Sequence, residues 1–408
     1  MIKIGNLEID KFYLGDKSDA KIYLGDVKVW PKEEEAPETY PYAFKRVSRG
    51  GSAYTVDCNS TSSNTIGSGD TRSGLSSSEI SGSTGDKTPV SVVFGDCCKK
   101  ISSGACSGWT YLTSVTISDN VTSLGAQSFD NTSRIEHLKI GSGITQLTQS
   151  YTFRDTGHSA STKPDLDLSK NIGLNVVGKS NNIFSWCYFN NVILPKNCTL
   201  GTSSFSNCSA STLSFGSGTI ISDGNDWPSI SSVFYYCNIS NIDLNGVTQI
   251  GDYAFHELSG CTSITIPPSV TDFGTYAFSG VSTLNSVTID YASNATLGSH
   301  QFKGCKSITS LAIGSNPTRI GENMFDNCTK LTTLVIPSNI SSIGGYAFYQ
   351  CSGLTSITVE SATPPTLGKG AFDNDYNCTI YVPPESVDAY KAASGWSDYK
   401  SRIQAIPT

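Results

Sequence analysis

The chain has 408 residues, a formal net charge of −7 at pH 7 and only 15% charged residues. Nucleic-acid binding depends on Lys and Arg side chains that neutralise phosphates, so this composition argues against nucleic acid or an anionic membrane surface as a partner. No stretch approaches the roughly 18 apolar residues of a membrane span. The start, Met1 to Glu8, lacks the basic and apolar regions of a secretory signal, so we expect synthesis and folding in a cytoplasm.

Residues 1–30 contain a short internal repetition, FYLGD at 12–16 and IYLGD at 22–26. β-Branched and aromatic residues punctuated by Gly-Asp turns predict a small antiparallel β module. Residues 31–41 follow as an acidic, Pro-flanked segment, which predicts a solvated linker. A tethered module of this kind suits an anchor, and its candidate contact or core aromatics are Tyr13, Tyr23 and Trp30.

Residues 42–91 lack the repeat that dominates the rest of the chain. Two short strands are predicted around Gly50-Gly51, followed by a loop at 60–88 that is dense in Ser, Thr, Gly and Asp. Because the end of a repeat array needs a polar cover, we expect this segment to cap the repeats on their N-terminal side.

Residues 92–382 are built from a repeat of 23 or 24 residues. The sequence RIGENMFDNCTKLTTLVIP at 319–337 returns as SIGGYAFYQCSGLTSITVE at 342–360. A fixed period in this range predicts a solenoid, in which each turn buries its apolar face against its neighbours. We count about twelve turns, with insertions at 162–175 and 222–230.

The repeat also predicts which side chains face inward. Alternation within 319–337 places Leu334 and Ile336 inside and Val335 outside, in a strand of a parallel sheet. Phe325 is expected to point inward from the opposite wall, and Gly321 to permit a tight bend.

Thirteen cysteines are present, and six of them lie three residues after a Phe. Residues at one phase of a repeat have parallel side-chain vectors, which is poor geometry for a disulfide. The pattern therefore predicts a reduced, buried packing ladder and nearly all thirteen thiols free, with no metal site at zinc-ligand spacing and no cofactor. The six are Cys187, Cys208, Cys237, Cys305, Cys328 and Cys351.

Residues 383–408 break the pattern with helix-start chemistry at Pro383-Pro384-Glu385. We expect a helical C-terminal cap whose apolar face is formed by Val387, Tyr390, Trp396 and Ile403.

The units VTQIGDYAFHELSGCTSITIP (247–267) and ISSIGGYAFYQCSGLTSITV (340–359) resemble the BspA-like, treponemal-type leucine-rich repeat family, as does the ending at 362–403. The resemblance implies a mainly β, partly α/β, leucine-rich-repeat solenoid with a parallel β-sheet. It also implies a bacterial surface protein that binds host or partner proteins, without catalytic motifs.

Residues 4–31 resemble the short N-terminal modules of virion proteins from phages of gut Bacteroidales. That resemblance implies a virion protein, assembled in the host cytoplasm, whose module docks on a protein of the particle. The solenoid would then bind a protein or glycan on the host surface. Two alternatives stay open: a passive structural decoration or spacer, and an adhesin on a bacterial cell surface.

The sequence predicts no enzyme, since its four His lie in different repeats and it has neither a nucleophile elbow nor a P-loop. An enzyme acting on glycans is the least favoured alternative. Aromatic residues do recur two positions before successive Phe residues, where amphipathic rings suit protein or sugar contacts. The simpler interpretation is that these rings pack along the solenoid wall. The candidate binding residues are Tyr253, Tyr276, His300 and Tyr346.

Overall fold

The computed structural model describes residues 89–178, 182–223, 232–373 and 378–407, together with six strands between Ile2 and Asp57. Tyr13, the linker at 31–41, the loop at 60–88 and most of the insertion at 222–230 lie outside the described residues. The chain divides into two compact units, Met1–Tyr40 and Pro41–Thr408.

The first unit contains two antiparallel strand pairs. β1 (Ile2–Ile4) pairs with β2 (Leu7–Ile9), and β3 (Ile22–Leu24) pairs with β4 (Val27–Trp30).

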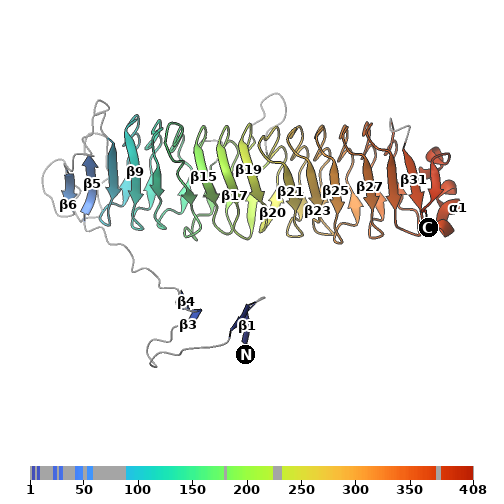
Figure 1. Ribbon diagram of the computed structural model, residues 1–408. Coiled ribbons are helices and arrows are strands. Elements are labelled where there is room, and N and C mark those ends of the chain that lie inside the picture. The colour runs from blue at the N-terminus through green and yellow to red at the C-terminus, as the bar shows by residue number, and fades with distance from the viewer. Residues whose placement is uncertain are drawn as a thin grey trace. The chain divides into compact units, whose positions relative to one another are not determined.

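The second unit is a parallel-strand solenoid of about 13 turns, one more than the sequence count (Figure 1). Each turn adds a strand to one wall, here called the strand wall, and most add a shorter strand to a second wall; all neighbouring pairs between turns are parallel. The strand wall consists of β7 (Val90–Phe94), β9 (Leu112–Ile117), β11 (His137–Lys139), β13 (Leu166–Asp167), β15 (Tyr188–Ile193), β17 (Ser209–Ser214), β19 (Asn238–Asp243), β21 (Ser263–Ile266), β23 (Ser286–Ile289), β25 (Ser310–Ile313), β27 (Thr333–Ile336), β29 (Ser356–Val359) and β31 (Thr379–Val382). The second wall consists of β8 (Lys100–Ile101), β10 (Ser123–Leu124), β12 (Gln146–Leu147), β14 (Val176–Val177), β16 (Thr199–Leu200), β18 (Thr219–Ile221), β20 (Val247–Ile250), β22 (Asp272–Phe273), β24 (Thr296–Leu297), β26 (Arg319–Ile320), β28 (Ser342–Ile343) and β30 (Thr366–Leu367).

Strand alternation positions the core as predicted. Leu334 and Ile336 are buried, while Val335 is 49% exposed on the strand wall. On the N-terminal side, β5 (Tyr42–Ser48) and β6 (Ala53–Asp57) form an antiparallel hairpin, and β5 pairs antiparallel with β7. The hairpin therefore covers the edge that the first parallel strand would otherwise expose.

A ladder of buried Phe rings runs through the interior. Successive rings stack with centroids 4.8 to 5.8 Å apart. Phe94 closes the N-terminal side by packing edge-on against Phe129, and Trp396 closes the C-terminal side against Phe372. The ladder residues are Phe129, Phe153, Phe184, Phe205, Phe234, Phe255, Phe278, Phe302, Phe325, Phe348 and Phe372.

The segments around the ladder Phe residues form a third wall, which we call the turn wall. Its backbone bonds run in one direction: the N–H of Phe278 donates to the carbonyl of Gln301 in the next turn, at 2.7 Å. The final turn has no following turn, and the N–H of Phe372 donates instead to the hydroxyl of Tyr399, at 3.3 Å. The C-terminal cap thus satisfies a backbone donor that the repeat leaves over.

The cap contains η1 (Pro384–Ser386), α1 (Val387–Ala392) and η2 (Trp396–Tyr399). Tyr390 and Trp396 are fully buried, as expected of the apolar face. The helical cap is present as predicted, and a strand follows it: β32 (Ile403–Ala405) pairs in parallel with β31. Residues after the helices therefore extend the strand wall.

Gly321 immediately precedes the turn at Glu322, and its backbone is not left-handed. Glycines at this phase allow close approach between turns: a Cβ added to Gly274 would lie 2.5 Å from the backbone nitrogen of Asp252. At Gly321 the added atom would instead meet the side chains of Met324 and Gln301, at 3.1 and 3.3 Å.

The ladder cysteines are buried free thiols, as predicted. Their Sγ–H groups donate to the carbonyl of a Phe in the preceding turn, for example Cys187 to Phe153 and Cys237 to Phe205, both at 2.8 Å. Each ladder thiol therefore satisfies a second acceptor site on a ladder carbonyl. Outside the ladder, Cys97 is disulfide-bonded.

The free thiols, both inside and outside the ladder, are expected to be unreactive in the folded protein. Burial raises the pKa of Cys98, Cys198 and Cys305 to about 12, which removes the reactive thiolate. Iodoacetamide at pH 8, followed by mass spectrometry, should label none of the eleven free cysteines before unfolding and all of them in denaturant. Rapid labelling of Cys305 in the native protein would contradict the buried ladder.

Candidate partner-binding surface

In most turns, the turn wall presents two positions of one backbone conformation, two residues before and two residues after the ladder Phe. Both have a left-handed backbone, with φ between 49° and 62° for the non-glycine residues. This conformation costs roughly 1–2 kcal/mol for a residue with a side chain and almost nothing for glycine. Other turns place Gly280, Gly304 or Gly370 at these positions. A bulky ring here therefore carries a conformational cost that the fold itself does not require.

Three of the four predicted binding residues lie together at the position before the Phe. The rings of Tyr253 and Tyr276 stack with centroids 5.1 Å apart, and those of Tyr276 and His300 with centroids 4.6 Å apart. All three side chains are partly exposed. Tyr346 lies apart from them, because the intervening turn carries Asn323, and it packs edge-on against its neighbour Tyr349 instead.

Further aromatic side chains, which were not among the predicted binding residues, extend this surface. Tyr236 is 54% exposed and contacts Tyr235, with ring centroids 4.1 Å apart, while His256 packs edge-on against Tyr253. Tyr236 stands two residues after a ladder Phe, a phase that could have been found by applying the same period to the other side of the Phe. We call the whole group the aromatic patch; it comprises Tyr235, Tyr236, Tyr253, His256, Tyr276 and His300.

The imidazoles of the patch are neutral at pH 7. Burial lowers the pKa of His256, and burial followed by the nearby Lys303 ammonium lowers the pKa of His300. The pKa of the Tyr236 hydroxyl is raised by hydrogen bonding to Tyr235 and then to Glu257, so the phenol stays protonated. Charged side chains beside these rings include Glu257, next to Tyr236 and His256, and Lys303, next to His300.

The strand wall offers a different surface, with few charges or rings. Val335 and Lys139 are exposed there. The other outward positions are Thr116, Thr265, Thr288, Ala312 and Thr358.

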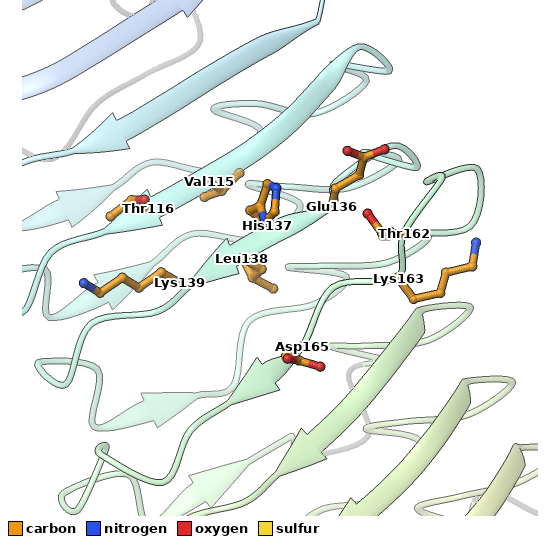
Figure 2. Close-up of a pocket in the computed structure, with 9 residues that line it drawn as sticks. All are labelled: Val115, Thr116, Glu136, His137, Leu138, Lys139, Thr162, Lys163 and Asp165. Atoms are coloured by element: carbon orange, nitrogen blue, oxygen red, sulfur yellow. The ribbon is translucent and has the colours of Figure 1, made fainter. Parts of the chain in front are cut away.

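A groove of about 440 Å³ opens in the strand wall where β11 and β13 are not paired (Figure 2). Its polar groups hold the adjacent insertion in place. Lys163 donates to the carbonyls of Gly157, His158 and Ala160, and Figure 2 shows its side chain directed away from Asp165. Lys163 in this groove therefore has a structural role, which is to hold the adjacent backbone segment.

In the first unit, Tyr23 lies in β3 and Trp30 in β4. Among the residues described, no group of three or more His, Cys, Asp or Glu could hold a metal ion. The described part of the chain likewise contains no helix long and apolar enough to cross a membrane.

The left-handed backbone at Tyr276 should affect stability. Tyr276→Gly should be about 1 kcal/mol more stable than Tyr276→Ala, because only glycine relieves the left-handed backbone. Loss of the stacked rings opposes this gain, so the glycine variant should stay within about 1 kcal/mol of the wild type. Urea unfolding of the three proteins measures the difference. Equal stability of the two variants would show that the backbone is not strained.

Comparisons with known proteins found similarity to leucine-rich repeat proteins. A model of the BspA type leucine-rich repeat region matches residues 87–168, 178–306 and 295–394. A leucine-rich repeat protein from Bacteroides ovatus is 21% identical, with a TM-score of 0.35 over 76% of this chain and 88% of that one. A leucine rich cell surface protein from Faecalibacterium prausnitzii is 18% identical, with a TM-score of 0.30 over 76% and 87%. The pneumococcal vaccine antigen PcpA is 13% identical, with a TM-score of 0.34 over 77% and 82%.

No curated protein matches the sequence. The family model covers most of the chain and spans the repeats from the first turn to the C-terminal cap. The chain belongs to the BspA-type leucine-rich repeat family.

Proposed function

We propose that this chain is a non-enzymatic binding protein that recognises a protein partner through the aromatic patch on the turn wall. The observation that supports the proposal is the placing of Tyr253, Tyr276 and His300 at left-handed positions where glycine serves other turns. Strain retained at a surface position is typical of functional sites.

The chemistry of the patch favours a protein over a glycan. The stacked rings cover one another's faces, and all three side chains are partly exposed. Tyrosine presented in this way supplies a large amphipathic contact area at low entropic cost, which is typical of protein interfaces. A passive spacer would not need rings at strained positions, and this distinguishes the proposal from the structural alternative.

Site-specific photocross-linking tests the binding role. The photoreactive residue p-benzoylphenylalanine is placed at Tyr276 in the full chain, and at Val335 on the strand wall as the matched control. Each protein is incubated with intact gut bacteria. The protein labelled at position 276 should cross-link to a discrete protein partner, and the protein labelled at position 335 should not. Equal cross-linking from both positions, or cross-linking to glycan alone, would contradict the proposal.

For attachment, we propose that residues 1–30 anchor the chain to a virion protein, with Tyr13, Tyr23 and Trp30 as contacts. The division into separate compact units supports an anchor that is independent of the solenoid. Anchoring to a bacterial cell surface, as expected of an adhesin, is the alternative.

Deletion of residues 1–30 tests this anchor. The truncated chain should keep its solenoid fold by circular dichroism but disappear from purified particles. Normal incorporation, or unfolding of the solenoid, would show that the module is another cap.

A further inference from the structure

The second wall is interrupted beside the aromatic patch, between β24 and β26. One sheet ends at β24 and another begins at β26, and the two strands are not paired. At the junctions on either side, the glycine after each strand donates its N–H to a carbonyl of the preceding turn, at 2.8 Å from Gly298 and 2.9 Å from Gly344. Among the described residues, no such bond joins Gly321 to Leu297. One backbone donor and one backbone acceptor therefore face this interruption without the bond that the other turns make.

A groove of about 380 Å³ opens at the interruption. Side-chain bonds cross it where backbone bonds do not: the hydroxyl of Tyr291 donates to the carbonyl of Arg319, and the guanidinium of Arg319 donates to the carbonyl of Ala295. Arg319 and Glu322 bring one charge of each sign, which favours a neutral polar ligand over an ion. The lining residues include Thr275, Leu297, Ser299, Arg319, Gly321 and Glu322.

A buried amide that lacks one partner lies against this groove. Gln301 is fully buried, and its Nε2 donates to the carbonyls of Phe273 and Gly298, at 3.3 and 3.0 Å. Its Oε1 has no hydrogen-bond partner among the described residues. A Cβ added to Gly321 would lie 3.3 Å from that oxygen, so Gly321 places no side chain between it and the groove. A buried acceptor left unpaired costs about 1–3 kcal/mol, and the fold does not require it, because Ala277 holds the same phase one turn earlier.

The groove is continuous with the aromatic patch. Thr275 and Ser299 line it and immediately precede Tyr276 and His300 in the chain. The hydroxyl of Ser299 lies 2.8 Å from Nδ1 of His300. A partner that covers these two rings therefore also covers the groove, and one of its side chains can enter it.

We propose that the groove binds the carboxamide of a glutamine or asparagine side chain of the protein partner. This inference rests on the proposed function and adds the chemistry by which the partner is recognised. A carboxamide combines a carbonyl acceptor with an NH₂ group that donates twice. Its acceptor matches the N–H of Gly321, and its donors match the carbonyl of Leu297 and Oε1 of Gln301. A carboxylate of the same shape offers no donor, and an ammonium or guanidinium offers no acceptor.

Met324 provides a spectroscopic reporter beside the groove, because the chain has 2 Met and Cε of Met324 lies 3.1 Å from the position of a Cβ added to Gly321. The full chain, labelled with carbon-13 in its methionine methyl groups, is titrated with N-acetylglutamine methylamide. The Met324 resonance should shift saturably, with a dissociation constant on the order of 10 mM, and the Met1 resonance should not move. N-acetylglutamate methylamide, which has the same shape and is ionised at pH 7, should leave Met324 unchanged.

A pair of variants tests the amide itself. Gln301→Ala introduces the residue that Ala277 already supplies at this phase, so the variant should fold, and it should bind the glutamine probe about fivefold more weakly or worse. Gln249→Ala, the same change in β20 of the second wall, should alter affinity less than twofold. Equal shifts of Met324 with the two probes, or no saturable shift, would overturn the inference. If the cross-link from position 276 forms but Met324 does not respond to the glutamine probe, the binding role stands and the carboxamide site fails.

Discussion

Replacing Phe278 by alanine is expected to lower the free energy of unfolding by about 3–5 kcal/mol. The ring is 1% exposed and stacks on Phe255 and Phe302 at 4.8 and 5.3 Å, so its removal leaves a cavity between two turns. The neighbouring rings cannot close the gap, because each is held by its own turn's backbone bonds to the next turn. Urea unfolding measures the loss, with Val335→Ala on the exposed strand wall as a control that should change stability by less than about 0.5 kcal/mol.

Because Phe278 lies inside the array, its loss should also change how the solenoid unfolds. In a solenoid each turn contacts only its neighbours, so a weak internal turn reduces the cooperativity of unfolding between the turns before it and the turns after it. Hydrogen exchange of Phe278→Ala should show faster exchange in the turns around residues 255–302 than in those near Phe348. A uniform rise in exchange along the ladder would contradict this local picture.

Trp396→Ala is expected to lower the free energy of unfolding by a similar amount, about 3–5 kcal/mol, for a different reason. Trp396 is fully buried, its Nε1–H donates to the carbonyl of Pro365 at 2.7 Å, and its ring covers Phe372. Its removal exposes the last ring of the ladder and leaves the carbonyl of Pro365 without that donor.

Uncapping should also change solution behaviour, because an exposed end of a parallel sheet is a template for association. Analytical ultracentrifugation of Trp396→Ala should show association that rises with concentration. Tyr399→Phe, which deletes only the hydroxyl that accepts from Phe372 N–H, should stay monodisperse and lose about 1–3 kcal/mol. A monodisperse Trp396→Ala of wild-type stability would show that the cap does not close the ladder.

The inward positions of the solenoid could be predicted because they follow directly from the period. Phe325 and Leu334 are separated by a constant offset in every good repeat, and a stack of turns buries everything at those phases. Backbone conformation could not be predicted in this way. The left-handed positions hold Asn, Tyr, His and Trp as well as Gly, so residue type does not reveal them.

Contacts between turns could not be predicted from the sequence either. Gly274 is needed for close approach rather than for an unusual φ, and β32 forms because β31 offers an unpaired edge to a segment arriving from the cap. Both depend on what lies one turn away, which local sequence does not describe.

Part of the candidate surface could be predicted from the period alone. Tyr253, Tyr276 and His300 share one phase in consecutive turns, and stacking turns necessarily bring them together. Tyr236 and Glu257 occupy the phase on the other side of the Phe, and their neighbourhood depends on the width of the turn wall. Their relation to the patch emerged only from the structure.

The central claim is that the aromatic patch is kept for binding at a cost to the fold, and Tyr276→Gly tests it most directly. The wild type, Tyr276→Gly and Asn323→Gly, which is the same change at the same phase one turn beyond His300, are compared for affinity to the partner identified by cross-linking. Tyr276→Gly should keep its stability and lose about 30-fold or more in affinity, as expected for a central tyrosine of an interface, while Asn323→Gly should change affinity less than twofold. Wild-type affinity of Tyr276→Gly would contradict the account.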